Sequence, residues 1–232
     1  MYRDGSFLTS FSMKKSCEKF NTPVTGGNVS FYNESNLGAV YPTPVIGMVG
    51  LLEDSSKHMD VSFKNSGDMI VAIGSINGEL GGSEYLKLCH GVIEGPIPEI
   101  NLEIESSLHK ICLELISKGL INSAHDLSDG GLAVNIAESI AYSKENIGAK
   151  LNLVRKLEDV EILFGECPSV IVITISEEKL YEFIILAQKH DIHTQTIGKV
   201  TDDSKLTINN NISVSREEIG SAYFESLEKH LN

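Results

Sequence analysis

The arrangement of apolar residues from position 68 onward most constrains the fold. Short apolar runs, most of them rich in β-branched residues, lie at 68–73, 121–125, 168–175 and 192–200 and are typical of buried strands. Segments whose apolar residues recur every three or four positions, as on one face of a helix, separate these runs. The alternation predicts an α/β or α+β domain in which helices pack on a mixed β-sheet.

Polar residues set the ends of two predicted helices. Asn101 predicts an N-cap, because its side chain can accept hydrogen bonds from the free amides of a first helical turn. Gly119 predicts the end of the same helix. For a second helix, expected over residues 130–142, the predicted cap is Ser128 or Asp129. In both cases the cap is expected to come from a neighbour in sequence.

The first 67 residues are organised differently. A short helix is predicted over residues 11–20, and Pro23 ends it because the residue before a proline disfavours the helical conformation. The apolar run at 45–52 predicts a buried strand. Residues 53–67 are mostly polar and predict a connector between two structural regions.

Composition and charge exclude several classes of function. The formal net charge of −13 predicts repulsion from nucleic acid and from anionic membranes, so neither is an expected partner. The four cysteines include no C-x-x-C pair, which argues against a zinc site or a disulfide framework. No signal peptide is recognisable, and the longest apolar run is too short to cross a bilayer. These features are typical of a cytoplasmic protein with a hydrophobic core.

The densest group of glycine and polar residues lies at positions 22–34. Gly27 follows another glycine, and paired glycines allow backbone amides to approach an anion closely. Asn28 offers a neutral oxygen to Mg²⁺, and Ser30 offers a hydroxyl to a substrate. A tight polar turn between a helix and a strand would explain the same residues equally well.

Two further segments combine glycine with polar residues. Residues 78–85 read GELGGSEY and predict a turn whose amides either bind an anion or simply begin a helix. Residues 125–132 read HDLSDGGL, where capping and turn formation explain the carboxylates better than a metal does, because a hard cation needs more oxygen ligands. The remaining histidines share no spacing with a carboxylate or a cysteine. No catalytic residue is therefore expected in this chain.

Taken in order, four segments resemble the motifs of a known enzyme family. Residues 23–34, 78–85, 125–132 and 163–169 are similar to motifs of the small-type synthetase subunit of phosphoribosylformylglycinamidine synthase. This family belongs to the aminoimidazole ribonucleotide synthetase-like superfamily. The resemblance implies an N-terminal region at 1–65, the end of an ATP-binding domain, followed by a complete C-terminal domain of that superfamily fold at 66–232.

The resemblance also implies roles for individual residues. Gly27 is expected to contact ATP, Asn28 to coordinate magnesium and Ser30 to contact the substrate. One departure is the turn at 166–168, which reads Glu-Cys-Pro where the first half of the family's duplicated chain holds substrate with Glu-Ser-Gln. This departure argues against a substrate role for the turn.

The function implied by the resemblance is a share in a ligase of purine biosynthesis. That enzyme uses ATP and Mg²⁺ to convert formylglycinamide ribonucleotide and glutamine-derived ammonia to formylglycinamidine ribonucleotide. The expected partners are the remainder of the synthetase subunit, a glutaminase subunit and a small accessory subunit. The chain alone is expected to be inactive, because the catalytic residues of the family lie upstream of the segments present here.

Two alternatives belong to other classes of function. The chain could act as a standalone structural or regulatory binding module. It could also belong to another ATP-using branch of the superfamily, such as selenophosphate synthetase or thiamine-phosphate kinase. Those branches lack the string Gly27-Asn28-Val29-Ser30 followed closely by Tyr-Asn-Glu.

Overall fold

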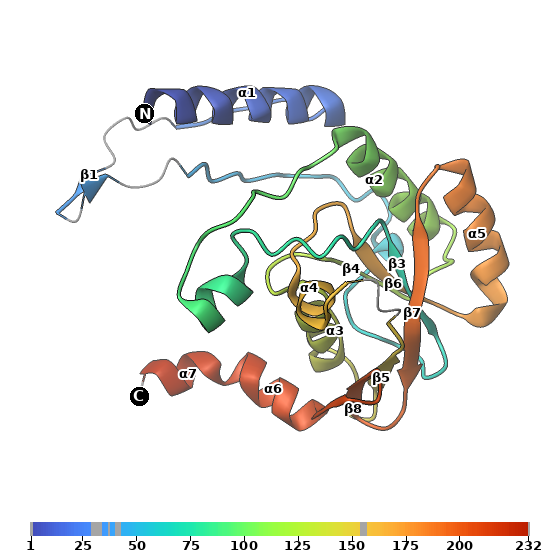
Figure 1. Ribbon diagram of the computed structural model, residues 1–232. Helices are drawn as coiled ribbons and strands as arrows, with labels where there is room; N and C mark the ends of the chain where they lie inside the picture. The colour runs from blue at the N-terminus through green and yellow to red at the C-terminus, as the bar shows by residue number, and fades with distance from the viewer. Residues whose placement is uncertain (1, 29–33, 37, 40–42, 154–156, 232) are drawn as a thin grey trace. The chain divides into compact units, whose positions relative to one another are not determined.

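The computed structural model (Figure 1) describes residues 2–28, 34–36, 38–39, 43–153 and 157–231. The chain divides into two compact units, Met1–Glu53 and Asp54–Asn232. Among the described residues, no helix is long and apolar enough to span a membrane.

In its described residues, the first unit consists of one long helix, a small hairpin and coil. Helix α1 (Tyr2–Phe20) begins well before the helix predicted from residue 11. It ends at the predicted place, just ahead of Pro23. Strand β1 (Glu34–Ser35) pairs antiparallel with β2 (Gly38–Ala39).

The apolar run at 45–52 forms no strand, so that prediction is wrong. Its side chains are exposed, with Val45 at 95% and Val49 at 103% of full exposure. A strand needs a neighbour that completes its hydrogen bonds. In the described part of the first unit, β1 and β2 pair with each other and no strand pairs with this run.

The second unit is built on a seven-stranded sheet in the order β4-β6-β3-β7-β5-β8-β9. The strands are β3 (Met69–Ile73), β4 (Ser123–Asp126), β5 (Gly148–Leu151), β6 (Ile171–Ile175), β7 (Thr194–Thr201), β8 (Lys205–Ile208) and β9 (Ile212–Ser215). Neighbouring strands are antiparallel, except that β5 and β8 are parallel. The predicted mixed sheet of an α/β or α+β fold is confirmed.

Helices cover both faces of this sheet (Figure 1). The helical segments are η1 (Ser55–Lys57), the π-helical η2 (Leu86–His90), α2 (Leu102–Ser117), α3 (Gly131–Ala141), α4 (Asp159–Phe164), η3 (Glu177–Lys179), α5 (Leu180–Lys189), α6 (Arg216–Phe224) and α7 (Ser226–Leu231). Asn101 caps α2, as predicted, by accepting from the amides of Glu103 at 2.9 Å and Ile104 at 3.3 Å.

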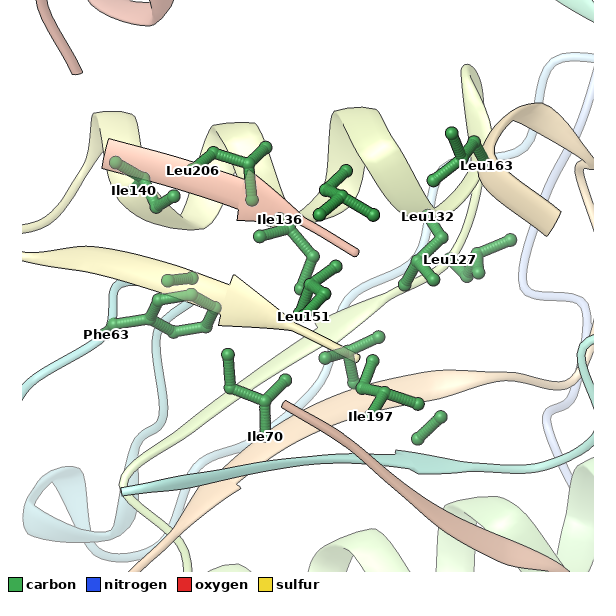
Figure 2. Packing of buried hydrophobic residues seen from close by; sticks show 14 of the residues in the cluster. Phe63, Ile70, Leu127, Leu132, Ile136, Ile140, Leu151, Leu163, Ile197 and Leu206 are labelled. Atoms are coloured by element: carbon green, nitrogen blue, oxygen red, sulfur yellow. The ribbon is translucent and has the colours of Figure 1, made fainter. Parts of the chain in front are cut away.

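The sheet separates the apolar residues into two cores, as the inner strand β3 shows. Successive side chains of a strand point to opposite faces, so Ile70 joins one core and Val71 the other. Helices α2 and α5 contribute to the core around Val71. Helix α3 contributes to the core around Ile70, where Figure 2 shows Ile136 and Leu151 among the packed side chains.

Residues just before the predicted boundary at 65 pack with the second unit. Phe63 is 2% exposed and lies in the core around Ile70 (Figure 2). The carbonyl of Asp60 accepts a hydrogen bond from the amide of Ala124 at 3.2 Å. The assignment of residues 1–65 and 66–232 to two functional domains stays a prediction.

Candidate functional site

Two of the three predicted ligand-binding residues of the first unit, Gly27 and Asn28, lie in coil after α1. Gly27 and Asn28 are exposed, whereas Ser30 falls outside the described residues. A Cβ atom built on Gly26 or on Gly27 meets no heavy atom within 4 Å. Neither glycine has a positive φ. Among the described residues, therefore, neither the packing nor the backbone conformation of the chain requires glycine at these positions.

In the second unit, Glu166 contacts two residues of the motif at 78–85 and one residue of the motif at 125–132. Its Oε1 accepts hydrogen bonds from the amide of Glu84 at 2.9 Å and from the amide of Gly130 at 2.8 Å. Its own amide donates to the carbonyl of Glu79 at 2.8 Å. Motifs that lie far apart in the sequence are thus joined at a single residue.

The hydrogen bond from Gly130 corrects the predicted cap of α3. Gly130 itself is the N-cap residue, with φ of 80°, and no side chain at the cap position completes it. The carboxylate of Glu166, 36 residues away, accepts the amide instead of Ser128 or Asp129. A negative charge there is favoured by the partial positive charge of the helix N-terminus. No pattern near residue 130 indicates this partner, so sequence reasoning missed it.

The thiol of Cys167 is buried and hydrogen-bonded within the fold. This thiol is fully buried, and Sγ accepts hydrogen bonds from the amides of Asn77 and Gly78, each at 3.2 Å. These bonds tie the turn at 166–168 to the start of the glycine-rich motif. Val170, three residues after Cys167 along the chain, is 2% exposed.

Two glycines of these motifs are required by the fold itself. Gly78 has φ of +72°, and a Cβ there would lie 2.8 Å from the Cβ of Glu161. Gly131 has φ of +70°, and a Cβ there would lie 2.7 Å from the carbonyl carbon of Phe164. Positive φ and close contact each disfavour any other residue.

His125 is held by groups of α3. Its Nδ1 lies 3.2 Å from the carbonyl oxygen of Asn135, and its Nε2 lies 3.4 Å from Oε2 of Glu138. The side-chain amide of Asn135 donates to the carbonyl of Asp126 at 2.7 Å. The histidine and aspartate at the start of this motif therefore fasten β4 to α3.

Asp129 lies near a lysine. The hydrogen bond to Glu84, the charge of Glu84 and then the charge of Asp129 raise the pKa of Lys87. Within the described residues, no three or more His, Cys, Asp or Glu side chains are grouped so that they could hold a metal ion. Asp129 is thus close enough to the ammonium group of Lys87 for the two charges to interact.

Comparison with known proteins places these motifs in a family context. The family model described as AIR synthase related protein, C-terminal domain, matches residues 65–209. The chain is 47% identical over 199 residues to the phosphoribosylformylglycinamidine synthase subunit PurL of Thermoanaerobacter pseudethanolicus, and 39% identical over 218 residues to that of Moorella thermoacetica. These matches cover 85% and 93% of the chain but only 27% and 30% of the relatives. The chain thus spans less than a third of their length.

Solved structures of PurL from Thermotoga maritima share the fold. The one described as complexed with FGAR matches with a TM-score of 0.59 at 23% identity, covering 72% of this chain and 30% of that one. The structure of PurLQS matches with a TM-score of 0.57 at 22% identity, covering 72% and 28%. At this level of identity the likeness establishes the fold.

Proposed function

Since the chain belongs to the family of AIR synthase related proteins, we propose that it forms part of phosphoribosylformylglycinamidine synthase. This ligase would convert formylglycinamide ribonucleotide, ATP and glutamine-derived ammonia to formylglycinamidine ribonucleotide in purine biosynthesis. The observation that carries the proposal is 47% identity, over 85% of the chain, to a subunit of that name. The four motifs, present in the family's order, support it.

In the proposed reaction, the amide oxygen of the substrate receives the terminal phosphoryl group of ATP. Ammonia then attacks the activated carbon, and phosphate leaves with the former amide oxygen. Such transfers depend chiefly on positioning of the reactants and on neutralisation of phosphate charge. The contribution of this chain would be to bind and orient ligands.

We assign three ligand contacts in the first unit. The backbone of Gly27 would lie beside the phosphates of ATP, the side-chain oxygen of Asn28 would bind Mg²⁺, and the hydroxyl of Ser30 would bind the substrate. The surroundings of Gly27 leave room for a ligand, because a Cβ there would meet no heavy atom within 4 Å. Mg²⁺ usually keeps several waters and phosphate oxygens as ligands, so Asn28 would supply only one of its ligands.

We propose that the chain forms one wall of the active site and does not catalyse the reaction alone. It spans only 27% of the relative from T. pseudethanolicus, so most of that subunit has no counterpart in it. Its partners would be the remainder of the synthetase subunit, a glutaminase subunit and a small accessory subunit. The solved PurLQS assembly of T. maritima supports such partners.

A hybrid enzyme tests this proposal. The aligned segment of the T. pseudethanolicus subunit would be replaced by this chain and assayed with ATP, Mg²⁺, formylglycinamide ribonucleotide and ammonium. We expect amidine formation within about tenfold of the parent enzyme, a change of ~1.4 kcal/mol in the activation free energy. The isolated 232 residues should form none. Turnover by the isolated chain, or a folded hybrid without turnover, would contradict the proposal.

A further inference from the structure

Two dipeptides in the motifs of the second unit have a sequence that is prone to spontaneous covalent change. Asn77 precedes Gly78, and Asp129 precedes Gly130. The backbone nitrogen that follows an Asn or Asp can attack the side-chain carbonyl carbon, and glycine favours this attack because it has no Cβ to hinder the approach. The pair at 77–78 is the one Asn–Gly pair in the sequence. Both dipeptides are therefore chemically open to modification.

The reaction at Asn77 converts its side-chain amide to a carboxylate. A bond forms between the nitrogen of Gly78 and Cγ of Asn77, and the bond from Cγ to Nδ2 breaks. The amide proton of Gly78 passes to solvent, and the departing nitrogen takes up a proton from solvent and leaves as ammonia. Water then opens the resulting succinimide ring to give aspartate or isoaspartate. At Asp129 the same ring closes with loss of water instead of ammonia.

The side chains of the two reactive residues are not protected by burial or by regular secondary structure. Asn77 and Asp129 are both exposed, the first in coil and the second in a turn. The glycines that follow them have φ of 72° and 80°, outside helix and strand geometry. Any protection must therefore come from how the amides of these two glycines are held.

The amide of Gly78 is held by a buried sulfur. It donates to Sγ of Cys167 at 3.2 Å, and this thiol is fully buried. The amide of Asn77 donates to the same sulfur at 3.2 Å, so the peptide groups on both sides of Asn77 are fixed. Ring closure would require these peptide groups to rotate and would leave a buried acceptor without its donor, which costs free energy. The hydrogen bonds to Cys167 therefore oppose the reaction.

The amide of Gly130 is held by the preceding residue of the same turn. Oε1 of Glu166 accepts this amide at 2.8 Å. The same oxygen accepts the amide of Glu84 at 2.9 Å, so the carboxylate is fixed from a second side. Hydrogen bonds to a charged acceptor are stronger than those between neutral groups. Adjacent residues of one turn thus hold the attacking nitrogen of both dipeptides.

We propose that Asn77 and Asp129 are latent sites of succinimide modification, and that the turn at 166–168 keeps them unmodified by holding the amides of the glycines that follow. Loss of either acceptor would release the reaction at its own site. Isoaspartate at position 77 would lengthen the backbone where it meets Cys167, and would disrupt the start of the motif at 78–85. This role of the turn requires no ligand and does not depend on the proposed ligase function.

The rate at Asn77 gives the first test. The full chain and a synthetic peptide of residues 74–82 would be incubated at neutral pH, and loss of the Asn77 amide followed by mass spectrometry. We expect the folded chain to react at least about tenfold more slowly than the peptide. Cys167→Ala, which removes the acceptor, should speed the reaction in the folded chain by about tenfold. The matched variant Cys167→Ser keeps an acceptor oxygen and should speed it less.

The rate at Asp129 gives a second, independent test. Chromatography separates aspartate from isoaspartate peptides of the digested chain. Glu166→Ala should speed isoaspartate formation at Asp129 by about tenfold, and Glu166→Gln, which keeps an acceptor oxygen, should speed it less. Each alanine variant should act chiefly on its own site. The Asp4–Gly5 pair in α1 lies in the other unit and should keep the same rate in every variant.

Three outcomes would overturn the proposal. One is a rate at Asn77 that is equal in the folded chain and in the peptide. Another is equal acceleration by the alanine variant and its matched variant at either site. The third is equal acceleration of both sites by each alanine variant, since a general loss of stability would then explain the result. Circular dichroism checks the fold of each variant, and the comparison of the wild-type chain with the peptide decides even where a variant does not fold.

Discussion

The glycine motif of the first unit and the glycine motifs of the second unit look alike in sequence but differ in what requires them. A side chain at Gly27 would meet nothing in the described chain, and its backbone has no positive φ. A side chain at Gly78 or Gly131 would collide with the chain, and both have positive φ. The motifs of the second unit are thus explained by its own fold. For the motif of the first unit, the described chain gives no such explanation, and our proposal that Gly27 lies beside a nucleotide rests on the family resemblance.

Among the substitutions that test this comparison, Gly131→Ala should change the free energy of unfolding most. Left-handed strain and overpacking against Phe164 should together lower the free energy of unfolding by about 2–5 kcal/mol. The same substitution at Gly27 should change it by less than about 0.5 kcal/mol. Urea denaturation of both variants measures the difference. Equal effects at the two positions would remove the distinction between the units.

Removal of the carboxylate that joins the motifs should have the next largest effect. Glu166→Ala leaves the amides of Glu84 and Gly130 without their acceptor, and should cost about 2–4 kcal/mol of unfolding free energy. Glu166→Gln keeps an acceptor oxygen and should cost less than half as much. The two urea midpoints test this, and equal losses would show that the charge rather than the acceptor matters.

A smaller effect on stability compares a helix capped by a residue next to it in sequence with a helix capped by a residue far away in sequence. Asn101→Ala removes a side chain that accepts two amides, and should cost about 1 kcal/mol. Ser128→Ala should cost less than about 0.5 kcal/mol, because Glu166 rather than Ser128 accepts the amide at the start of α3. Thermal unfolding of the two variants measures this. A loss of stability for Ser128→Ala equal to that for Asn101→Ala would indicate that Ser128 is the cap of α3, as predicted from the sequence.

The smallest expected effect on stability concerns Glu114, a residue outside all the motifs that serves as a reference. Hydrogen bonds from His190 and Lys189 hold the pKa of Glu114 below its usual value of 4.5. A lowered pKa in the folded state stabilises the fold above pH 4.5, and this contribution is lost as the pH falls through the folded-state pKa. The difference in urea midpoint between the wild type and Glu114→Gln should therefore be small at pH 7 and should shrink at pH 3. A difference that grows on acidification would contradict this.

The fold of the second unit could largely be predicted because its signals are local. β-branched runs gave the strands, and the cap at Asn101 was identified correctly. Strand β5 (Gly148–Leu151) was missed because four residues that include a lysine carry too little apolar pattern. The run at 45–52 misled the prediction because periodicity indicates an apolar segment, not whether a neighbour is present to bury it.

The site was harder to predict than the fold because its contacts are not local. The acceptor for the amide of Gly130 lies 36 residues away, and no spacing rule connects the two. For Gly27 and Asn28 the resemblance supplied roles that their local chemistry left open, and those roles stay predictions. Ser30 lies outside the described residues, so its role also stays a prediction.

The most direct test of the central claim compares neighbouring glycines in the hybrid enzyme. Gly26→Ser and Gly27→Ser meet equally open space, so both should fold like the parent. Gly26→Ser should retain activity, because no ligand contact is proposed for Gly26 and a Cβ there meets open space. Gly27→Ser should lower kcat/KM by about a hundredfold, since a displaced nucleotide reacts poorly. Equal activity of the two variants would contradict the claim that Gly27 is required by ATP.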